Sequence, residues 1–285
     1  MIGIVTDSSC DLPQEVVARY GLEIVPLSIR FGDTEFVDRE QLGTDEFWRR
    51  CSGAAELPST AAPSPGRFEQ AYRRLAEHGS REIVAVTLSG ALSATHQSAT
   101  LAAGSVAADG ITVEVVDSRT LSLGLGTVVI ACAEAAAARG DAPGGLDSVV
   151  ELAGDLVSRT RMFGALDTLE NLKKGGRVGG AKALLATALS IKPIIEVRDG
   201  AVEQYGKQRT RSKALRFLVD IVAAQRGRME HLGVLHADCG DVDAFVAELQ
   251  PHFDGQIVVG QIGPVIGTHV GKGTMGVAYI ERRAS

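Results

Sequence analysis

The first half of the chain repeats one pattern that restricts its fold: a β-branched apolar run, a short polar turn, and then a helix-like stretch. In the first unit we predict a strand over residues 2–5 and a helix that Asp11 caps, with Pro13 in its first turn. A later unit has a helix that begins near Ser93. The pattern occupies residues 2–21, 81–104 and 111–140. Repeated β-turn-α units predict a parallel sheet with right-handed crossovers, that is, a Rossmann-like α/β domain.

The second half follows a different rhythm. Residues 191–210 read IKPIIEVRDGAVEQYGKQRT, where Asp199-Gly200 marks the turn of a hairpin. Three more strands are predicted over residues 231–239, 256–263 and 275–282. Short connections pair strands antiparallel, so we expect an α+β domain with a mixed or antiparallel sheet.

The boundary between the two halves is marked by composition. Residues 138–148 read ARGDAPGGLDS and are rich in Gly, Pro and Asp, which are residues of turns and linkers. We therefore expect one domain over residues 1–155 and another over 156–285, with a ligand pocket between and within them.

The overall composition excludes some classes of partner. The chain has 285 residues, 45% of them hydrophobic, which is enough for two ordinary cores. Its net charge of −6, from 29 basic and 35 acidic residues, provides no field that would attract nucleic acid. The longest uncharged apolar stretch, residues 121–133, is shorter than the roughly 20 residues of a membrane span. It predicts a buried helix, and we expect no transmembrane segment.

The N-terminus and the cysteines favour the cytoplasm. The chain begins MIGIVTDSS, a strand-like run without the basic and apolar regions of an export signal. Cys10, Cys51, Cys132 and Cys239 lie far apart and form no C-x-x-C pair. We expect all four to be reduced and mostly packed in the interior.

A glycine-rich stretch near the C-terminus, residues 262–276, reads IGPVIGTHVGKGTMG. It contains the G-x-G-x-x-G spacing of dinucleotide-binding folds, but that motif follows the first strand of a βαβ unit, and only nine residues follow it here. It is not a P-loop either, because Lys272 is followed by glycine. We interpret the stretch as a turn that presents His269 at a strand end. That histidine has no H-x-H or H-x-x-x-H partner, so no metal site is expected.

Hydroxyl-rich loops are the other candidate site. Ligands of open parallel sheets bind outside the carboxyl ends of the strands, and the loops there carry TDSS, LSGALSATH and VDSR. Ser93 either contacts a ligand or only caps its helix. The loop ELPSTAAPSPGRF, residues 56–68, holds Thr60 between prolines, or is an ordinary solvated connection.

A pair of helices is predicted over residues 166–193, which read LDTLENLKKGGRVGGAKALLATALSIKP. The C-terminus of the first helix is basic and is closed by glycine. The apolar faces of both helices either belong to the core or wall a cavity between the domains. The leucines concerned are Leu166, Leu169, Leu172, Leu184, Leu185 and Leu189.

Seven motifs in a fixed order resemble one family. They are TDSSCDL at 6–12, VPLSIRFGDTEFVD at 25–38, PSTAAPSPGRF at 58–68, LSGALSATHQSA at 88–99, VDS at 116–118, LENLKKGGRVG at 169–179 and IGTHVGKGTMG at 266–276. In these motifs the chain resembles the DegV family of bacterial fatty-acid-binding proteins from end to end. The resemblance implies a protein without enzyme activity of its own or a cofactor, which buries one palmitate- or oleate-like fatty acid. It also implies a separate ATP-dependent fatty acid kinase, which phosphorylates the presented carboxylate to an acyl phosphate for phospholipid synthesis.

The resemblance also implies site residues. Thr60, Ser93 and His269 match the positions that bind the fatty-acid carboxylate. The chain departs from the family pattern in three places. Residues 60–63 read Thr-Ala-Ala-Pro in place of threonine-serine-glutamine-proline, and residues 93–96 read Ser-Ala-Thr-His in place of serine-glycine-threonine-tyrosine. Lys272 stands where proline is common. We regard Ala61, Ala62, Ala94 and Thr95 as supporting positions.

Two further hypotheses remain. Basic residues near the pocket mouth could steer the kinase, or could simply form a solvated charged face. The candidates are Arg177, Lys207, Arg209 and Arg211. As a different class of function, Asp7, Asp117 and His269 could serve a stand-alone hydrolase or phosphotransferase, although there is no G-x-S-x-G elbow.

Overall fold

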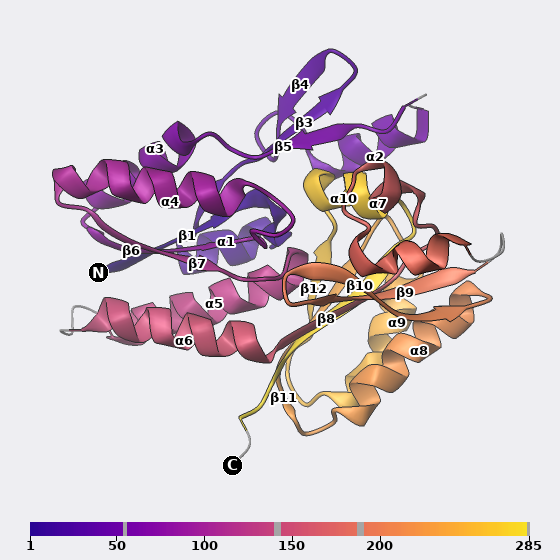
Figure 1. Cartoon of the computed structure of the whole chain (residues 1–285). Coiled ribbons are helices and arrows are strands. Elements are labelled where there is room, and N and C mark those ends of the chain that lie inside the picture. Colours follow the sequence, from indigo (N-terminus) through magenta and orange to yellow (C-terminus); the bar gives the residue numbers. More distant parts are fainter. Residues whose placement is uncertain (54–55, 140–143, 187–190, 284–285) are drawn as a thin grey trace.

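The computed structural model describes residues 1–53, 56–139, 144–186 and 191–283. Figure 1 shows two layered halves, with the indigo-to-magenta N-terminal elements above and to the left of the orange-to-yellow C-terminal sheet. The N-terminal sheet is parallel, in the order β2-β1-β6-β7. Its strands are β1 Ile2–Asp7, β2 Glu23–Val25, β6 Glu82–Thr87 and β7 Thr112–Asp117.

Helices cover both faces of this parallel sheet. α3 and α4 pack on each other over one face, and α1, α5 and α6 lie on the other (Figure 1). The helices are α1 Gln14–Tyr20, α3 Pro65–Glu77, α4 Thr95–Val106, α5 Ser122–Arg139 and α6 Gly145–Arg159, with the 3₁₀ turns Ser8–Cys10 and Ala107–Asp109. The predicted boundary between residues 155 and 156 falls within α6, and its place stays a prediction.

The C-terminal sheet has six strands in the order β10-β9-β8-β13-β11-β12. All its pairs are antiparallel except β11 with β12, so the predicted two-domain fold with a mixed second sheet is confirmed. The strands are β8 Thr160–Ala165, β9 Lys192–Arg198, β10 Ala201–Gln208, β11 Met229–His236, β12 Val258–Gln261 and β13 Met275–Glu281. The predicted hairpin joins β9 to β10, where Asp199 and Gly200 both have positive φ.

Helices cover one face of the mixed sheet and close one end of the other. α8 and α9 pack on the outer face, whereas α7 and α10 contact each other beside the N-terminal half (Figure 1). These elements are α7 Glu170–Lys174, α8 Arg211–Ala224, α9 Val242–Leu249 and α10 Pro264–Val270, with the 3₁₀ segments Gly179–Ala186 and Gln250–His252.

A third, three-stranded sheet was not predicted. Its order is β4-β3-β5, and its strands are β3 Ser28–Phe31, β4 Thr34–Val37 and β5 Ser59–Ala61. The helix α2 Thr44–Gly53 lies between β4 and β5 in the chain. β5 pairs Thr60 with Ile29, which is fully buried. The loop predicted around Thr60 is therefore an edge strand, and its backbone position is fixed by the pairing.

α5 lies between the two large sheets and contacts strands of both. It is long and apolar enough to cross a membrane, but 67% of it is buried inside the protein, as expected of a core helix. The main hydrophobic core contains residues of both halves, such as Ile4, Leu123, Met162 and Ile195. The two halves thus share this core, and each half also has a hydrophobic cluster of its own. All four cysteines are free, and three of them are buried.

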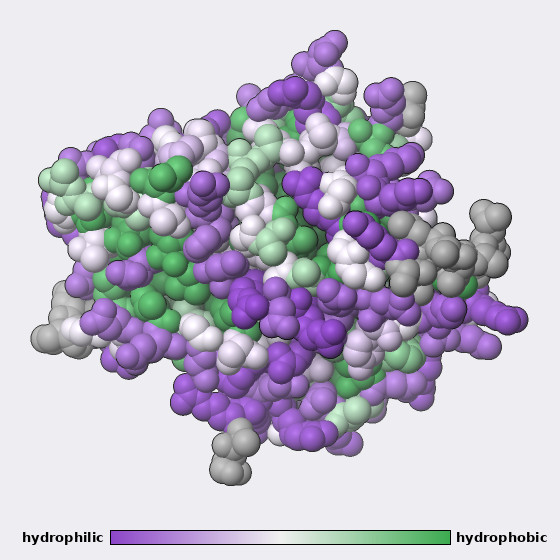
Figure 2. All heavy atoms as spheres, in the orientation of Figure 1, coloured by the Kyte–Doolittle hydropathy of each residue, from purple (hydrophilic) through white to green (hydrophobic). Residues whose placement is uncertain are grey.

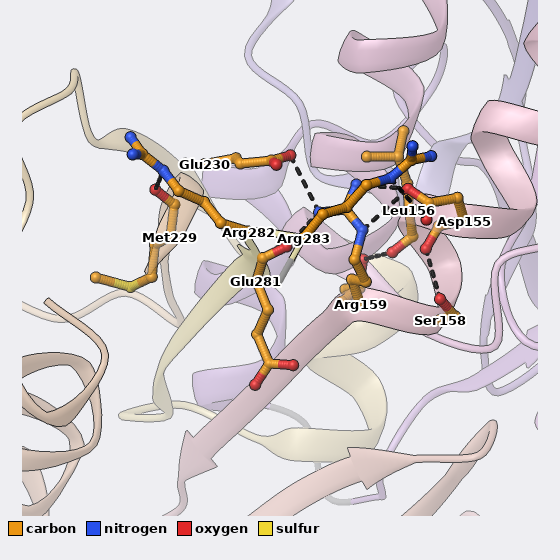
Figure 3. A network of polar contacts seen from close by, with 10 residues as sticks. Asp155, Leu156, Ser158, Arg159, Met229, Glu230, Glu281, Arg282 and Arg283 are labelled. Atoms are coloured by element: carbon orange, nitrogen blue, oxygen red, sulfur yellow. Dashed lines mark hydrogen bonds and ion pairs between the residues drawn. The ribbon is translucent and has the colours of Figure 1, made fainter. Parts of the chain in front are cut away.

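A network of charges fastens α6 to the C-terminal sheet (Figure 3). Arg159 pairs with Asp155 at 2.6 Å and with Glu230 at 3.1 Å, and it donates to the carbonyl of Glu281. Arg283 adds a pair with Asp155 at 3.2 Å. The Arg159 side chain is only 14% exposed, so solvent screens its pairs less than it screens an ordinary surface ion pair.

Two local predictions are wrong. α1 begins after Pro13, and Asp11 does not cap it but has a left-handed backbone with a φ of 51°. His269 lies in α10 and not at a strand end, because Pro264 occupies the first turn of that helix. Hydrogen bonds between distant residues hold the backbone in both places: Asp11 accepts from Ser122 and from Gly263, which precedes α10.

Candidate functional site

An apolar cavity lies between the carboxyl end of β6 and the inner face of the mixed sheet. The volume of the cavity is about 170 Å³. Figure 2 shows green, apolar atoms in a recess near α7 and α10. Its apolar and glycine lining consists of Leu27, Ala62, Leu88, Leu92, Ala94, Leu121, Met162, Phe163, Gly164, Leu166, Leu172, Ile195, Val197, Val202, Leu235, Ile262, Val265, Ile266 and Val270.

The polar residues in this lining are Thr60, Ser93, Arg177, His269 and Thr274. The hydroxyl of Thr274 donates to the Val270 carbonyl within its own turn. Of the other four, Thr60 contacts His269, and Arg177 donates to the carbonyl of Leu92, the residue before Ser93. The cavity is therefore a largely hydrocarbon-lined space with a few polar residues, and the predicted Thr60, Ser93 and His269 all line it.

One polar contact of the cavity joins two segments that are 209 residues apart. Thr60 Oγ1 lies 3.0 Å from His269 Nε2, whereas the buried Nδ1 of His269 has no hydrogen-bond partner among the residues that the structure describes. Nδ1 packs against Gly175 so closely that a side chain at Gly175 would collide with the ring. The glycine that ends α7 thus makes room for the imidazole.

His269 is neutral at physiological pH. Burial, and then the positive charge of Arg177, lower the pKa of His269 to about 4. A neutral imidazole carries one N–H and one free nitrogen, so the ring can donate a hydrogen bond to a carboxylate without adding a charge.

Ser93 lies one residue before Ala94, the N-cap of α4. It lines the cavity, and its Oγ also accepts the backbone N–H of Thr95 at 3.3 Å and contacts Thr95 Oγ1 at 2.9 Å. The other supporting positions differ. Ala62 and Ala94 line the cavity, whereas Ala61 is exposed and does not.

Asp7 and Asp117 do not line the cavity with His269. Asp7 is fully buried and accepts the N–H groups of Ser9 at 3.0 Å and Leu88 at 2.7 Å; burial raises its pKa. Asp117 accepts the N–H of Arg119 at 2.8 Å. Both acids hold loops together, and the hydrolase hypothesis gains no support from their positions. In the described part of the chain, no group of three or more His, Cys, Asp or Glu could hold a metal ion.

Asp11 is a structural residue of the site that sequence reasoning missed. Its Oδ1 accepts the N–H of Gly263 at 2.9 Å, and its Oδ2 accepts the hydroxyl of Ser122 at 2.5 Å. Gly263 precedes α10, which carries His269, and Ser122 begins α5. Burial raises the pKa of Asp11 to about 7. No local signal predicts this role, because both partners are remote in sequence.

The basic candidates occupy different settings. Lys207 and Arg209 are exposed at the end of β10. Arg211 bonds both carboxylate oxygens of Asp241, at 2.7 and 2.8 Å, and donates to the carbonyl of Gly273, so it stabilises the fold locally. The Arg177 guanidinium donates to two backbone carbonyls, those of Leu92 at 3.2 Å and Gly175 at 2.7 Å.

In the described residues of the leucine-rich stretch, one short α-helix, α7, is followed by a 3₁₀ segment where a second helix was predicted. Leu166 and Leu172 line the cavity and Leu169 is buried in the core, so both hypotheses for these leucines hold in part. The side chains of Leu184 and Leu185, and Leu189 as a whole, lie outside the described residues.

Comparison with known proteins identifies the family. A family model described as the DegV family of uncharacterised proteins matches residues 1–282. This chain belongs to the DegV family. A DegV domain-containing protein of Mycobacterium tuberculosis is 37% identical over 96% of this chain and 95% of its own length.

Solved DegV-family structures have the same fold. A fatty-acid-binding DegV-family protein from Thermus thermophilus aligns with a TM-score of 0.87 at 32% identity, over 98% of this chain and 99% of its own. A DegV-family protein from Ruminococcus gnavus, solved with vaccenic acid, aligns with a TM-score of 0.85 at 26% identity, over 97% and 99%. Relatives of this chain therefore bind fatty acids.

The buried carboxyl of Asp11 makes a prediction about pH. Because its folded pKa of about 7 lies above the ordinary value of 3.8, the folded state binds more protons than the unfolded state between these values. This contribution to stability is complete at low pH and is lost as the pH rises to about 7. Asp11→Asn stays neutral and can still accept from Gly263 and donate to Ser122. Its melting temperature should fall less than that of the wild type between about pH 5 and pH 8.

The control is Asp33→Asn, which removes an exposed aspartate from the turn between β3 and β4. It should show the pH dependence of the wild type. Equal pH dependence in the wild type and Asp11→Asn would show that Asp11 is ionised in the folded protein throughout this range.

Proposed function

We propose that this protein binds one long-chain fatty acid, similar to palmitate or oleate, with its tail in the apolar cavity and its carboxylate at Thr60, Ser93 and His269. The observation that carries the proposal is the Thr60–His269 contact of 3.0 Å on the wall of a cavity that is otherwise almost entirely hydrocarbon. Fatty-acid binding by relatives supports the same ligand class.

The tail supplies the affinity in this proposal. Each buried CH₂ contributes about 0.8 kcal/mol, so about 14 methylenes give a gross term near 11 kcal/mol before the costs of binding. The lining is rich in Leu, Ile and Val, and Phe163 is its aromatic member. Such a lining suits a flexible aliphatic chain better than a planar ligand.

The carboxylate would be held by neutral groups. Two hydroxyls and a neutral imidazole can bond to its oxygens without forming an ion pair. A bidentate arginine would clamp both oxygens and reduce their nucleophilicity. Arg177 is near, but its Nε and one terminal nitrogen already bond to backbone carbonyls. The bound carboxylate thus keeps the reactivity that a phosphoryl acceptor needs.

The protein would then act as a substrate-presenting subunit. A separate ATP-dependent kinase would transfer the phosphoryl group to the carboxylate and form an acyl phosphate for phospholipid synthesis in the cytoplasm. The chain needs no cofactor for this role. Turnover of ATP by the protein alone would instead favour the hydrolase or phosphotransferase alternative.

Substitutions of the hydroxyls test the carboxylate site. Thr60→Val keeps the branched shape in β5, and Ser93→Ala removes one oxygen. Each loses a hydrogen bond to a charged group, worth about 1.5 to 3 kcal/mol, so the Kd for oleate should rise about 10- to 100-fold. The measurement is titration calorimetry with delipidated protein. Ser59→Ala, at the exposed neighbour of Thr60, should bind like the wild type. Wild-type affinity in both site variants would place the carboxylate elsewhere.

A charge reversal tests the docking of the kinase. Arg209 is exposed just before α8, so Arg209→Glu should leave oleate affinity within a few-fold of the wild type. It should slow acyl-phosphate formation by the added kinase, most strongly at low salt, because charge steering weakens with screening. Arg226→Glu makes the same charge change beyond the other end of α8 and serves as the control. Transfer rates equal to the control would remove Arg209 from the docking surface.

A further inference from the structure

A second hollow lies close to the fatty-acid cavity and has the opposite character. It is a polar groove between α6, the loop after β7 and the hairpin end of β9. Charged and hydroxyl side chains line it, including Ser118, Arg119, Arg161, Glu196, Arg198 and Asp199. Its charges are paired in part: Arg119 lies 3.2 Å from Asp199, and Arg198 lies 3.7 Å from Glu196.

The linings of the cavity and the groove meet at neighbouring residues. The chain passes from groove to cavity between Thr120 and Leu121, and again between Arg161 and Met162, while Val197 borders both spaces. Two segments therefore change from one lining to the other between adjacent residues, and a third segment borders both hollows at Val197.

The wall residues are packed together and buried. Leu121, Met162 and Val197 are 8%, 5% and 7% exposed. Met162 and Val197 are direct cross-strand partners on β8 and β9, so their side chains lie next to each other on the same face. The hydroxyl of Thr120 lies 3.6 Å from the Met162 sulfur and restrains that flexible side chain.

A hydrocarbon tail gains affinity only as far as this wall. Each methylene buried in the cavity raises affinity about fourfold, whereas a methylene pushed into a polar, charged groove would displace water from groups that need it. The length of the cavity up to the wall therefore decides how many methylenes contribute.

We propose that Leu121, Met162 and Val197 form the stop that sets the preferred acyl chain length of this protein. This inference rests on the proposed fatty-acid binding and adds its specificity determinant. Met162 is the adjustable member, because methionine is unbranched and fills irregular gaps. A smaller side chain at Met162 or Val197 lengthens the cavity towards the groove, and a larger one shortens it.

The test is a series of Kd values for saturated fatty acids of 12 to 20 carbons, measured with delipidated wild type, Met162→Ala, Val197→Ala and Val197→Leu. Both alanine variants should shift the preferred length upward by about two carbons, since the removed side-chain volume is filled by the tail. Val197→Leu should shift it downward. Val234→Ala removes the same atoms from the core on the other face of the sheet and should keep the wild-type profile.

Each outcome decides the proposal. Should Met162→Ala fail to fold, the opposite shifts of the two Val197 variants still test the stop. An unchanged length profile in folded wall variants would overturn the stop but leave fatty-acid binding intact. Profiles shifted equally by Val234→Ala would also overturn it, because general loosening of the core would then be the cause. A wild type that binds no fatty acid of any length would reject the proposed function itself, and the stop with it.

Discussion

A buried hydrogen bond between residues 252 positions apart holds the candidate site together. Asp11 follows β1 in the N-terminal half, and it accepts the backbone N–H of Gly263 at 2.9 Å, at the entrance to α10. Its second oxygen bonds Ser122 at the start of α5. An unpaired carboxyl in such a place would cost several kcal/mol, so the three segments are held in one arrangement.

α10 then has little freedom. Trp48 of α2 donates to the carbonyl of Ile262 at 3.2 Å, and Gly267 lets α10 approach the rings of Phe47 and Trp48 more closely than any side chain would allow. One face of the helix is thereby fixed against α2, and His269 is directed towards Thr60. The neutral, buried imidazole is a consequence of this packing. It needs no contribution from a bound ligand.

The sequence predicted the parts of the fold that depend on local patterns. Repeated β-turn-α units predicted the parallel sheet, and Asp199-Gly200 predicted the β9–β10 hairpin. Prediction from the sequence failed where contacts between distant segments determine the secondary structure. The pattern around His269 was consistent with a glycine turn, but Pro264 and the contacts with α2 make it a helix. Likewise, a hydroxyl-rich loop proved to be strand β5, because Ile29 supplies its partner.

The site shows the same division. Thr60, Ser93 and His269 could be selected by their motifs, and the structure brings them to one cavity. The role of Asp11, the space that Gly175 leaves for the imidazole, and the wall at Met162 and Val197 depend on contacts between remote segments. The residues that line the cavity come from both halves of the chain, so no local sequence pattern could predict the shape of the cavity.

In the proposed function, the cavity holds one acyl chain. The most direct measurement is organic extraction of protein purified under native conditions, followed by mass spectrometry of the extract and quantification against protein. The account predicts about one fatty acid for each chain, chiefly of the length of palmitate or oleate. Recovery of no acyl chain, even after incubation with palmitate or oleate, would contradict it.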